Sequence, residues 1–199
     1  MNDINKYEFT IEDCSKIMNF ARDALYTYII EGQRMDIGSV DDVLNKRAGV
    51  IIQIESANGF KRLRGSSGIY DGRRIADAII DATIHAASSR SIGSEINASE
   101  IDNVIFKISV VEQVQITKEP EEILEVGENC PIITKDINHW LYPTQAIEQQ
   151  WSPEEYIHRT VRTSSKDLSY DDIELVAVLD VKSFVEQNPN GKTILDTAK

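Results

Sequence analysis

The sequence predicts an α+β fold with two lobes: a mainly antiparallel sheet flanked by helices, and a smaller β lobe. Apolar residues recur at helical spacing from Ile11 to Tyr28 and from Ile75 to Ala86. Two short β-type runs flank Asn58-Gly59, and Asn-Gly is the strongest short-range signal for a hairpin. From Val104 to Val110, side chains alternate as one buried face of a strand requires. These helical and strand patterns do not follow each other as regular βαβ units, which favours α+β.

A long helix and a polar connector are expected at the N-terminus. Thr10 is suited to cap the helix, because Asp13 follows three residues later as in a capping box. The helix should end near Gly32, and residues 33–47 read as a connector. Cys14 falls on the apolar face of this helix, so we expect a buried and unreactive thiol.

The central stretch predicts a hairpin, a turn of small residues and a helix. The second hairpin strand runs into Gly65–Gly68, which we predict to be a sharp, exposed turn before the helix Ile75–Ser88. Asp77, Asp81 and His85 have the spacing of metal ligands along this helix. A solvated polar face is the commoner interpretation of such spacing, and we expect no metal and no cofactor.

The C-terminal half predicts shorter elements. They are a helical turn at 99–102, a turn at 119–122, strands at 123–126, 132–134 and 173–184, and helices at 144–150 and 152–164. We treat residues 1–199 as one domain, with a larger lobe from 1–115 and 140–186 and a smaller β lobe from 116–139. The tail, 187–199, is expected to fray.

Composition excludes several classes of protein. With 41% hydrophobic and 27% charged residues, the chain has the balance of an ordinary globular protein. It carries no apolar run long enough to span a membrane, and its first residues lack the apolar stretch of a signal peptide, so we expect a cytoplasmic protein. Two cysteines are too few for a disulfide framework. A net charge of −12 makes DNA an unlikely partner and disfavours anionic membranes.

One segment departs from this acidic average. The segment from Lys46 to Arg74 contains seven lysines and arginines but only two acidic residues, which gives it a net charge of +5. A local positive patch of this kind suits a small anionic ligand or an acidic segment of a partner. The alternative is that these charges decorate an edge hairpin, where Lys and Arg discourage the addition of another strand.

Four motifs resemble one known family. Leu63–Gly68, which reads Leu-Arg-Gly-Ser-Ser-Gly, resembles the Leu-Arg-Gly-Cys-Ile-Gly signature of the AMME-syndrome candidate protein family. This is the family of the Alport, mental retardation, midface hypoplasia and elliptocytosis chromosomal region. Phe106–Val111 is similar to its Val-x-Val-Leu strand, and Arg90 to the arginine of its Asp-Pro-Arg-Phe loop. A further segment matches at Leu141, Pro143, Ala146, Glu148 and Trp151, so the resemblance covers about residues 48–186.

The resemblance implies a two-lobed α+β fold with a cleft and no established activity. Genomic association with a dioxygenase-like Memo protein and a radical-SAM protein is a feature of that family, so the resemblance implies such a protein as a possible partner. The chain departs from the family at Ser66, where the signature has cysteine, and at Ser67, where it has isoleucine. A thiolate mechanism at that position cannot operate here, because a serine hydroxyl needs a positioned base. Either an activity has been lost, or the position serves backbone shape and small size.

We therefore expect an accessory binding module that recognises an anionic small molecule or an acidic partner segment in a cleft between the lobes. An enzyme, or the substrate-handling subunit of one, is the first alternative, and RNA or nucleotide handling the second. A purely structural turn, with Arg64 paired to a carboxylate inside the protein, stays open, as does the oligomeric state, a dimer included. No catalytic residue is assigned. The predicted ligand-binding residues are Arg64, Gly65, Ser66, Ser67, Gly68, Arg90, Pro143 and Glu148.

Overall fold

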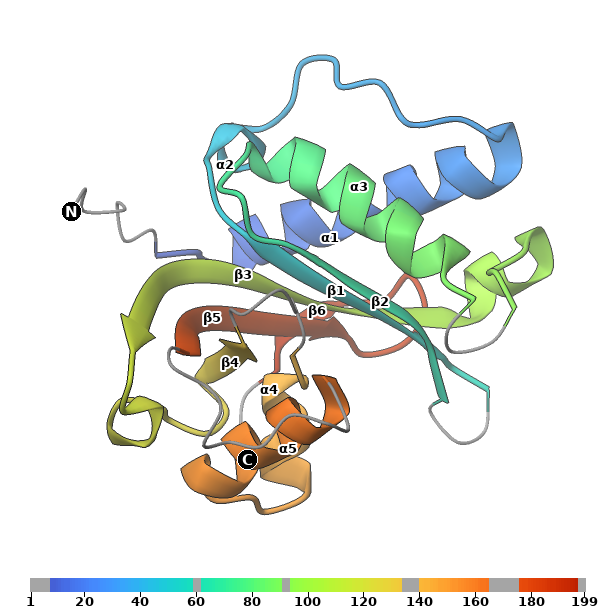
Figure 1. Ribbon diagram of the computed structural model, residues 1–199. Coiled ribbons are helices and arrows are strands. Elements are labelled where there is room, and N and C mark those ends of the chain that lie inside the picture. The colour runs from blue at the N-terminus through green and yellow to red at the C-terminus, as the bar shows by residue number, and fades with distance from the viewer. Residues whose placement is uncertain (1–7, 59–61, 91–93, 134–139, 165–175, 197–199) are drawn as a thin grey trace. The chain divides into compact units, whose positions relative to one another are not determined.

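The computed structural model describes residues 8–58, 62–90, 94–133, 140–164 and 176–196 (Figure 1). Across these residues, strands form one sheet in the order β2-β1-β3-β5-β4, with β6 paired to β5. The β1–β2, β1–β3, β4–β5 and β5–β6 pairs are antiparallel. Helices and an antiparallel sheet in one chain confirm the predicted α+β class.

The element bounds follow the sequence prediction closely for the helices and less closely for the strands. The helices are α1 (Ile11–Tyr26), α2 (Asp42–Asn45), α3 (Ile75–Ser88), α4 (Pro143–Glu148) and α5 (Pro153–Ser164), with a π-helical turn at Thr27–Glu31 and 3₁₀ turns at Ala98–Asn103 and Pro120–Glu122. The strands are β1 (Val50–Ser56), β2 (Arg62–Ile69), β3 (Val104–Thr117), β4 (Asn129–Ile133), β5 (Val176–Glu186) and β6 (Thr193–Leu195).

The first helix begins and ends where its capping residues predict. The Asp13 backbone N–H donates to Thr10 Oγ1 at 3.1 Å, and the Thr10 N–H donates to Asp13 Oδ2 at 3.0 Å, which completes the capping box. The π-helical turn continues α1 as far as Glu31. Gly32 then adopts a φ of +69°, the left-handed conformation typical of a helix C-terminus.

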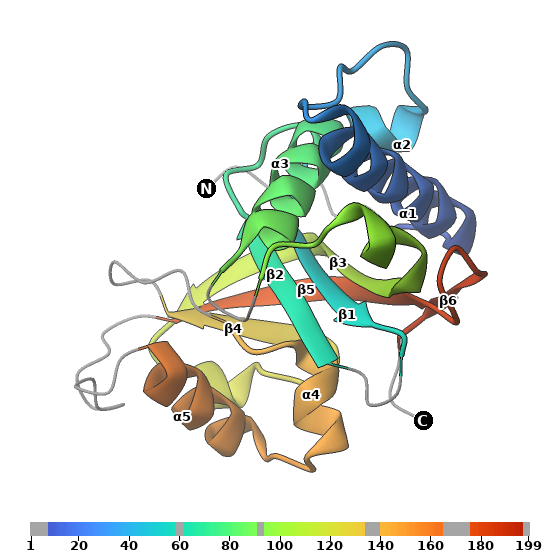
Figure 2. The same cartoon turned by 90° about the vertical axis from the view of Figure 1, so that its right-hand side faces the viewer.

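The core beside α1 and α3 is built on one face of β1. Figures 1 and 2 show the two helices side by side over β1 and β2. Ile52 and Ile54 of β1 are fully buried, and their partners on β3 are Ile108 and Phe106, which are buried as well. Opposed residues of neighbouring strands point to the same face, so these four side chains form a continuous apolar layer.

The prediction of a turn at Gly65–Gly68 is wrong. These residues lie inside β2, where Gly65 is paired with Ile54 and Ser66 with Gln53. Small residues are typical of turns, but here pairing with the apolar strand β1 supplies a ladder and overrides the local preference. The hairpin itself is confirmed by the antiparallel β1–β2 pair, while residues 59–61 of its turn lie outside the described residues.

Three further predictions differ from the structure. β3 runs on to Thr117, six residues beyond the expected end at 111. The strand expected at 123–126 is absent from that described segment, where Val126 makes only an isolated bridge with Asn129. The tail is not frayed at Thr193–Leu195, because these residues pair with β5 and Thr193 is buried. Long-range pairing, which local sequence does not encode, decides all three.

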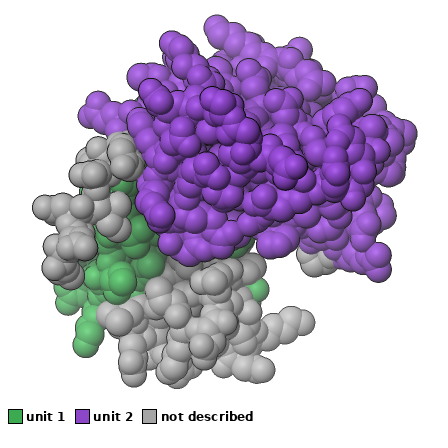
Figure 3. Space-filling model, turned by 90° about the horizontal axis from the view of Figure 1, so that it is seen from above, with its two compact units in different colours: residues 1–7, 111–182, 197–199 green, residues 8–110, 183–196 purple. Residues whose placement is uncertain are grey.

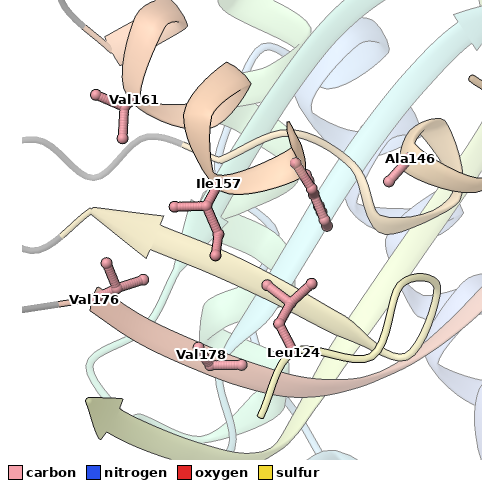
Figure 4. Packing of buried hydrophobic residues seen from close by; sticks show 7 residues of the cluster. Leu124, Ala146, Ile157, Val161, Val176 and Val178 are labelled. Atoms are coloured by element: carbon pink, nitrogen blue, oxygen red, sulfur yellow. The ribbon is translucent and has the colours of Figure 1, made fainter. Parts of the chain in front are cut away.

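A second apolar cluster joins α4, α5 and β5 (Figure 4). Tyr156 and Ile157 of α5 are fully buried against Val178 of β5, and the Tyr156 hydroxyl donates to the Leu141 carbonyl at 2.6 Å. The whole cluster comprises Leu124, Ala146, Tyr156, Ile157, Val161, Val176 and Val178. It gives this part of the chain a core of its own.

The chain divides into two compact units (Figure 3). Unit 1 comprises residues 1–7, 111–182 and 197–199, and unit 2 comprises residues 8–110 and 183–196. The boundaries therefore fall inside β3 and β5. They differ from the predicted lobes, which divided the chain at 115, 139 and 186. No described helix is long and apolar enough to cross a membrane.

Candidate functional site

Arg64, the predicted anion-binding side chain, is held by a carboxylate. Its Nη2 lies 2.7 Å from Glu100 Oε1 and 3.4 Å from the Ser94 carbonyl, and the side chain is only 11% exposed. The positive charge is thus partnered within unit 2. This is the arrangement that the structural alternative expects. The Arg64 Nε is buried and makes no hydrogen bond with a described residue, so anion binding by Arg64 stays a prediction.

The last two arginines of the basic segment pair with acids from α3. Arg73 contacts Asp81 at 2.7 Å and Arg74 contacts Asp77 at 2.9 Å, while Arg34 joins both aspartates. The hydrogen bond from Arg74 holds the pKa of Asp77 below its usual value. Three of the seven basic residues of the 46–74 segment, Arg64, Arg73 and Arg74, are therefore paired with carboxylates, and a positive patch formed by the others stays a prediction. Asp77 and Asp81, two of the three residues with the spacing of metal ligands, are therefore paired with arginines.

The other predicted residues occupy different surroundings. Arg90 is 82% exposed on its side chain and pairs with Glu95 at 2.9 Å. Pro143 is buried as the first residue of α4, and Glu148 is exposed at its end; both belong to unit 1, whereas Arg64 and Arg90 belong to unit 2. A joint site formed by all of them stays a prediction.

Ser66 lies on a sheet face with several polar side chains of unit 2. It stands opposite Gln53 of β1, which in turn stands opposite Lys107 of β3. Opposed side chains point to the same face, and so does Glu55, two residues beyond Gln53 on its strand. Ser109 of β3 shares this face too. We call the group the polar sheet face; its members are Gln53, Glu55, Ser66, Lys107, Ser109 and Ser183.

Hydrogen bonds and an ion pair connect this face. Glu55 Oε1 lies 3.4 Å from Lys107 Nζ and accepts a hydrogen bond from Gln53 Nε2 at 3.3 Å. The Ser109 and Ser183 hydroxyls are 2.7 Å apart. The side chains of Lys107 and Glu55 are only 11% and 9% exposed, whereas Gln53 and Ser66 are half-buried. The polar sheet face therefore contains a buried ion pair and, beside it, the partly accessible side chains of Gln53 and Ser66.

One atom of the buried pair lacks a partner. Glu55 Oε2 is shielded from solvent and makes no hydrogen bond with any described residue. Burial of a charge is unfavourable unless its hydrogen-bonding capacity is used, so buried polar atoms in native proteins are nearly always paired. Arg64 Nε and Thr83 Oγ1 are buried without a hydrogen bond in the described residues as well, but only Glu55 Oε2 belongs to the polar sheet face.

No base is hydrogen-bonded to Ser66 among the described residues. Its hydroxyl makes no hydrogen bond with another side chain in the described part of the chain. A serine nucleophile requires such a base within hydrogen-bond reach, so the enzyme interpretation gains no support here. His85 is exposed on α3, and His139 lies outside the described residues.

A pocket of about 700 Å³ lies elsewhere in unit 2, between α1 and the segment before α2. Asp23, Asp41 and Asp42 line it together with a single lysine, Lys16, and Phe20. None of the predicted site residues takes part. Its excess of negative charge opposes an anionic ligand.

The two cysteines are buried, and neither is a candidate nucleophile. Cys130 lies 3.6 Å from the Leu141 carbonyl, and burial raises the pKa of its thiol to about 12. The thiolate, which is the reactive form, is therefore absent at neutral pH. Cys14 is fully buried on α1, which confirms the expected environment of this side chain.

Comparison with known families now decides what the chain is. The family model described as AMMECR1 matches residues 18–177. The chain belongs to the AMMECR1 family. The resemblance seen in the motifs around Arg64, Arg90 and Pro143 is thereby confirmed.

Two relatives and one solved structure are similar to this AMMECR1-family chain. Protein VNG_2543C of Halobacterium salinarum is 31% identical over 180 residues, which cover 85% of this chain and 86% of that protein. Protein PAE0745 of Pyrobaculum aerophilum is 26% identical over 92% of this chain and 91% of its own length. The crystal structure of the uncharacterized protein PH0010 from Pyrococcus horikoshii superposes with a TM-score of 0.82 at 22% identity, covering 96% of this chain and 100% of that one. This likeness shows a shared fold.

Sequence reasoning named one member of the polar sheet face and missed the others in this AMMECR1-family chain. Gln53, Glu55 and Lys107 occupy alternate positions inside strands that are otherwise apolar. That pattern normally indicates a solvated outer face of an antiparallel sheet. The signal that distinguishes them is burial, which depends on tertiary packing.

Proposed function

We propose that the chain is a binding module without catalytic chemistry of its own, and that it binds a small anionic molecule on the polar sheet face. The observation that carries the proposal is the buried Lys107–Glu55 pair in the same row as Ser66, the residue at the family's signature position. An accessory role beside a dioxygenase-like or radical-SAM partner is a separate proposal that rests on the family resemblance alone.

The row supplies the donors that an anion requires. Lys107 offers an ammonium group, Ser66 a hydroxyl and Gln53 an amide, and all three project from the same face. Side chains directly opposed on neighbouring strands are separated by about 5 Å, so one carboxylate or phosphate can contact two of them. Charge-assisted hydrogen bonds are the stronger kind, which makes Lys107 the main anchor.

The signature residues position this row. Gly65 lets β2 lie directly against α3, and the alternation of side chains along β2 then places Ser66 on the opposite, polar face. In this arrangement Lys107 takes the role that the sequence assigned to Arg64. Arg64 instead ties β2 to Glu100 of the 3₁₀ turn before β3.

Thermal unfolding with a panel of small anions tests the proposal. We would compare inorganic phosphate, acetate, glycolate, succinate and malate. A ligand at about 100 times its dissociation constant should stabilise the protein by about 2.7 kcal/mol. Ser66→Ala should weaken binding, and the charge-neutral double variant Lys107→Met/Glu55→Gln should weaken it about tenfold or more, because a hydrogen bond to a charged group is lost.

The matched control is Lys192→Met, which removes a lysine from an exposed position away from the polar sheet face. It should bind as the wild type does. If no anion in the panel stabilises the wild type, or if the double variant binds every anion unchanged, the proposed function is wrong.

A further inference from the structure

We infer that the ligand of the polar sheet face is a carboxylate with a hydrogen-bond donor on its α-carbon, an α-hydroxy or α-amino acid. This inference rests on the proposed function, since it concerns the same site. It follows from the hydrogen-bonding state of Glu55, whose second oxygen is buried and unpartnered.

Glu55 uses only half of its carboxylate. Oε1 lies beside Lys107 Nζ and accepts from Gln53 Nε2, whereas Oε2 accepts nothing from the described residues. An ionised carboxylate carries about four acceptor sites on its two oxygens. A buried carboxylate in this condition is incomplete, and the missing group must donate an N–H or an O–H.

Glu186, a second buried carboxylate in the same unit, gives a comparison for the hydrogen bonding of Glu55. Glu186 Oε1 accepts from Arg22 Nε at 2.8 Å, and Oε2 accepts from Arg22 Nη2 and from the Phe106 backbone N–H at 2.9 Å. Both oxygens of Glu186 are therefore used. Glu55 differs from Glu186 in having one oxygen that accepts no hydrogen bond from a described residue.

The charges around Glu55 define the ligand further. A plain anion would meet Lys107 favourably but would also bring negative charge toward Glu55 Oε2. A ligand that donates a hydrogen bond to Oε2 and presents its carboxylate to Lys107 satisfies both groups. Because Lys107 already lies within 3.4 Å of the same Glu55 carboxylate, the donor and the anionic group of the ligand must be within a few bonds of each other. An α-hydroxyl or α-amino group meets that condition.

Matched pairs of acids test the inference by isothermal titration. Glycolate and acetate differ by one hydroxyl, as do malate and succinate. For the wild type we expect the hydroxy acid of each pair to bind about tenfold more tightly, the value of one hydrogen bond to a charged group. In Glu55→Gln the preference should shrink, because the amide replaces one of the two acceptor oxygens with a donor.

Glu100→Gln is the matched control, since it makes the same substitution at a carboxylate that pairs with Arg64. It should keep the wild-type preference. Equal binding of both members of each pair to the wild type overturns the inference and leaves the proposed function intact; Oε2 is then satisfied by water alone. If no acid binds, the inference is wrong, and the proposed function is wrong as well only if inorganic phosphate also fails to bind. The wild-type comparison decides even where Glu55→Gln does not fold.

Discussion

At Gly65 the chain has no room for a side chain. A Cβ built on this residue would lie 1.9 Å from the Ala86 carbonyl oxygen, a backbone atom of α3 that cannot rotate away. The glycine is thus required by close packing of β2 against α3. Its neighbour Ser66 is then committed to the other face. One small residue in this way fixes the orientation of the proposed binding row.

Gly65→Ala should destabilise the protein by about 1–3 kcal/mol, the usual range for overpacking a dense core. Urea unfolding followed by circular dichroism measures the change. Gly38→Ala is the control, because a Cβ there meets nothing within 4 Å. If the Gly65→Ala protein is as stable as the Gly38→Ala protein, β2 and α3 do not approach each other as described.

Within the elements, sequence predicts most where the signal is local. The capping box at Thr10, the glycine end of the first helix and the period of Ile75–Ser88 all depend on neighbours a few residues apart, and all are confirmed. The sequence alone predicts a turn at Ser66, because nothing in the four small residues encodes its pairing with Gln53 across the hairpin. The sequence predicts the strand that contains Lys107 but not its ion pair, because the partner Glu55 is 52 positions away in the sequence.

The arginine–aspartate network on α3 predicts a pH dependence. Arg74 lowers the pKa of Asp77 relative to the value of 3.8 taken for the unfolded chain. The folded state therefore gains stability from the ionised Asp77 above pH 3.8, and this gain is lost as the pH falls through the lowered pKa of the folded state.

Asp77→Asn should consequently destabilise the protein at pH 7 by up to about 1 kcal/mol, as partly exposed ion pairs do, and by less near pH 3. Free energies of unfolding from urea titrations at the two pH values measure this. The exposed Asp36, changed to Asn, is the control. A difference between wild type and Asp77→Asn that grows on acidification would contradict the assignment.

For the whole molecule, the boundaries between the two units cut through two strands of the sheet. β3 and β5 each contribute residues to unit 1 and to unit 2, so loss of either unit removes part of both strands. Each unit also holds one fully buried cysteine, Cys14 in unit 2 and Cys130 in unit 1. The cysteines can therefore report the unfolding of each unit separately.

We expect a single cooperative transition, because the shared strands link the two cores. Cys14→Ala leaves Cys130 as the reporter, and Cys130→Ala leaves Cys14. Pulsed labelling with a thiol reagent along a urea gradient gives a labelling midpoint for each variant, and circular dichroism gives its unfolding midpoint. We expect the two midpoints to coincide in both variants. At pH 8 without urea, Cys130 should stay unlabelled, since burial raises its thiol pKa to about 12. Labelling of one cysteine at a clearly lower urea concentration than the circular dichroism transition would instead show that its unit unfolds alone.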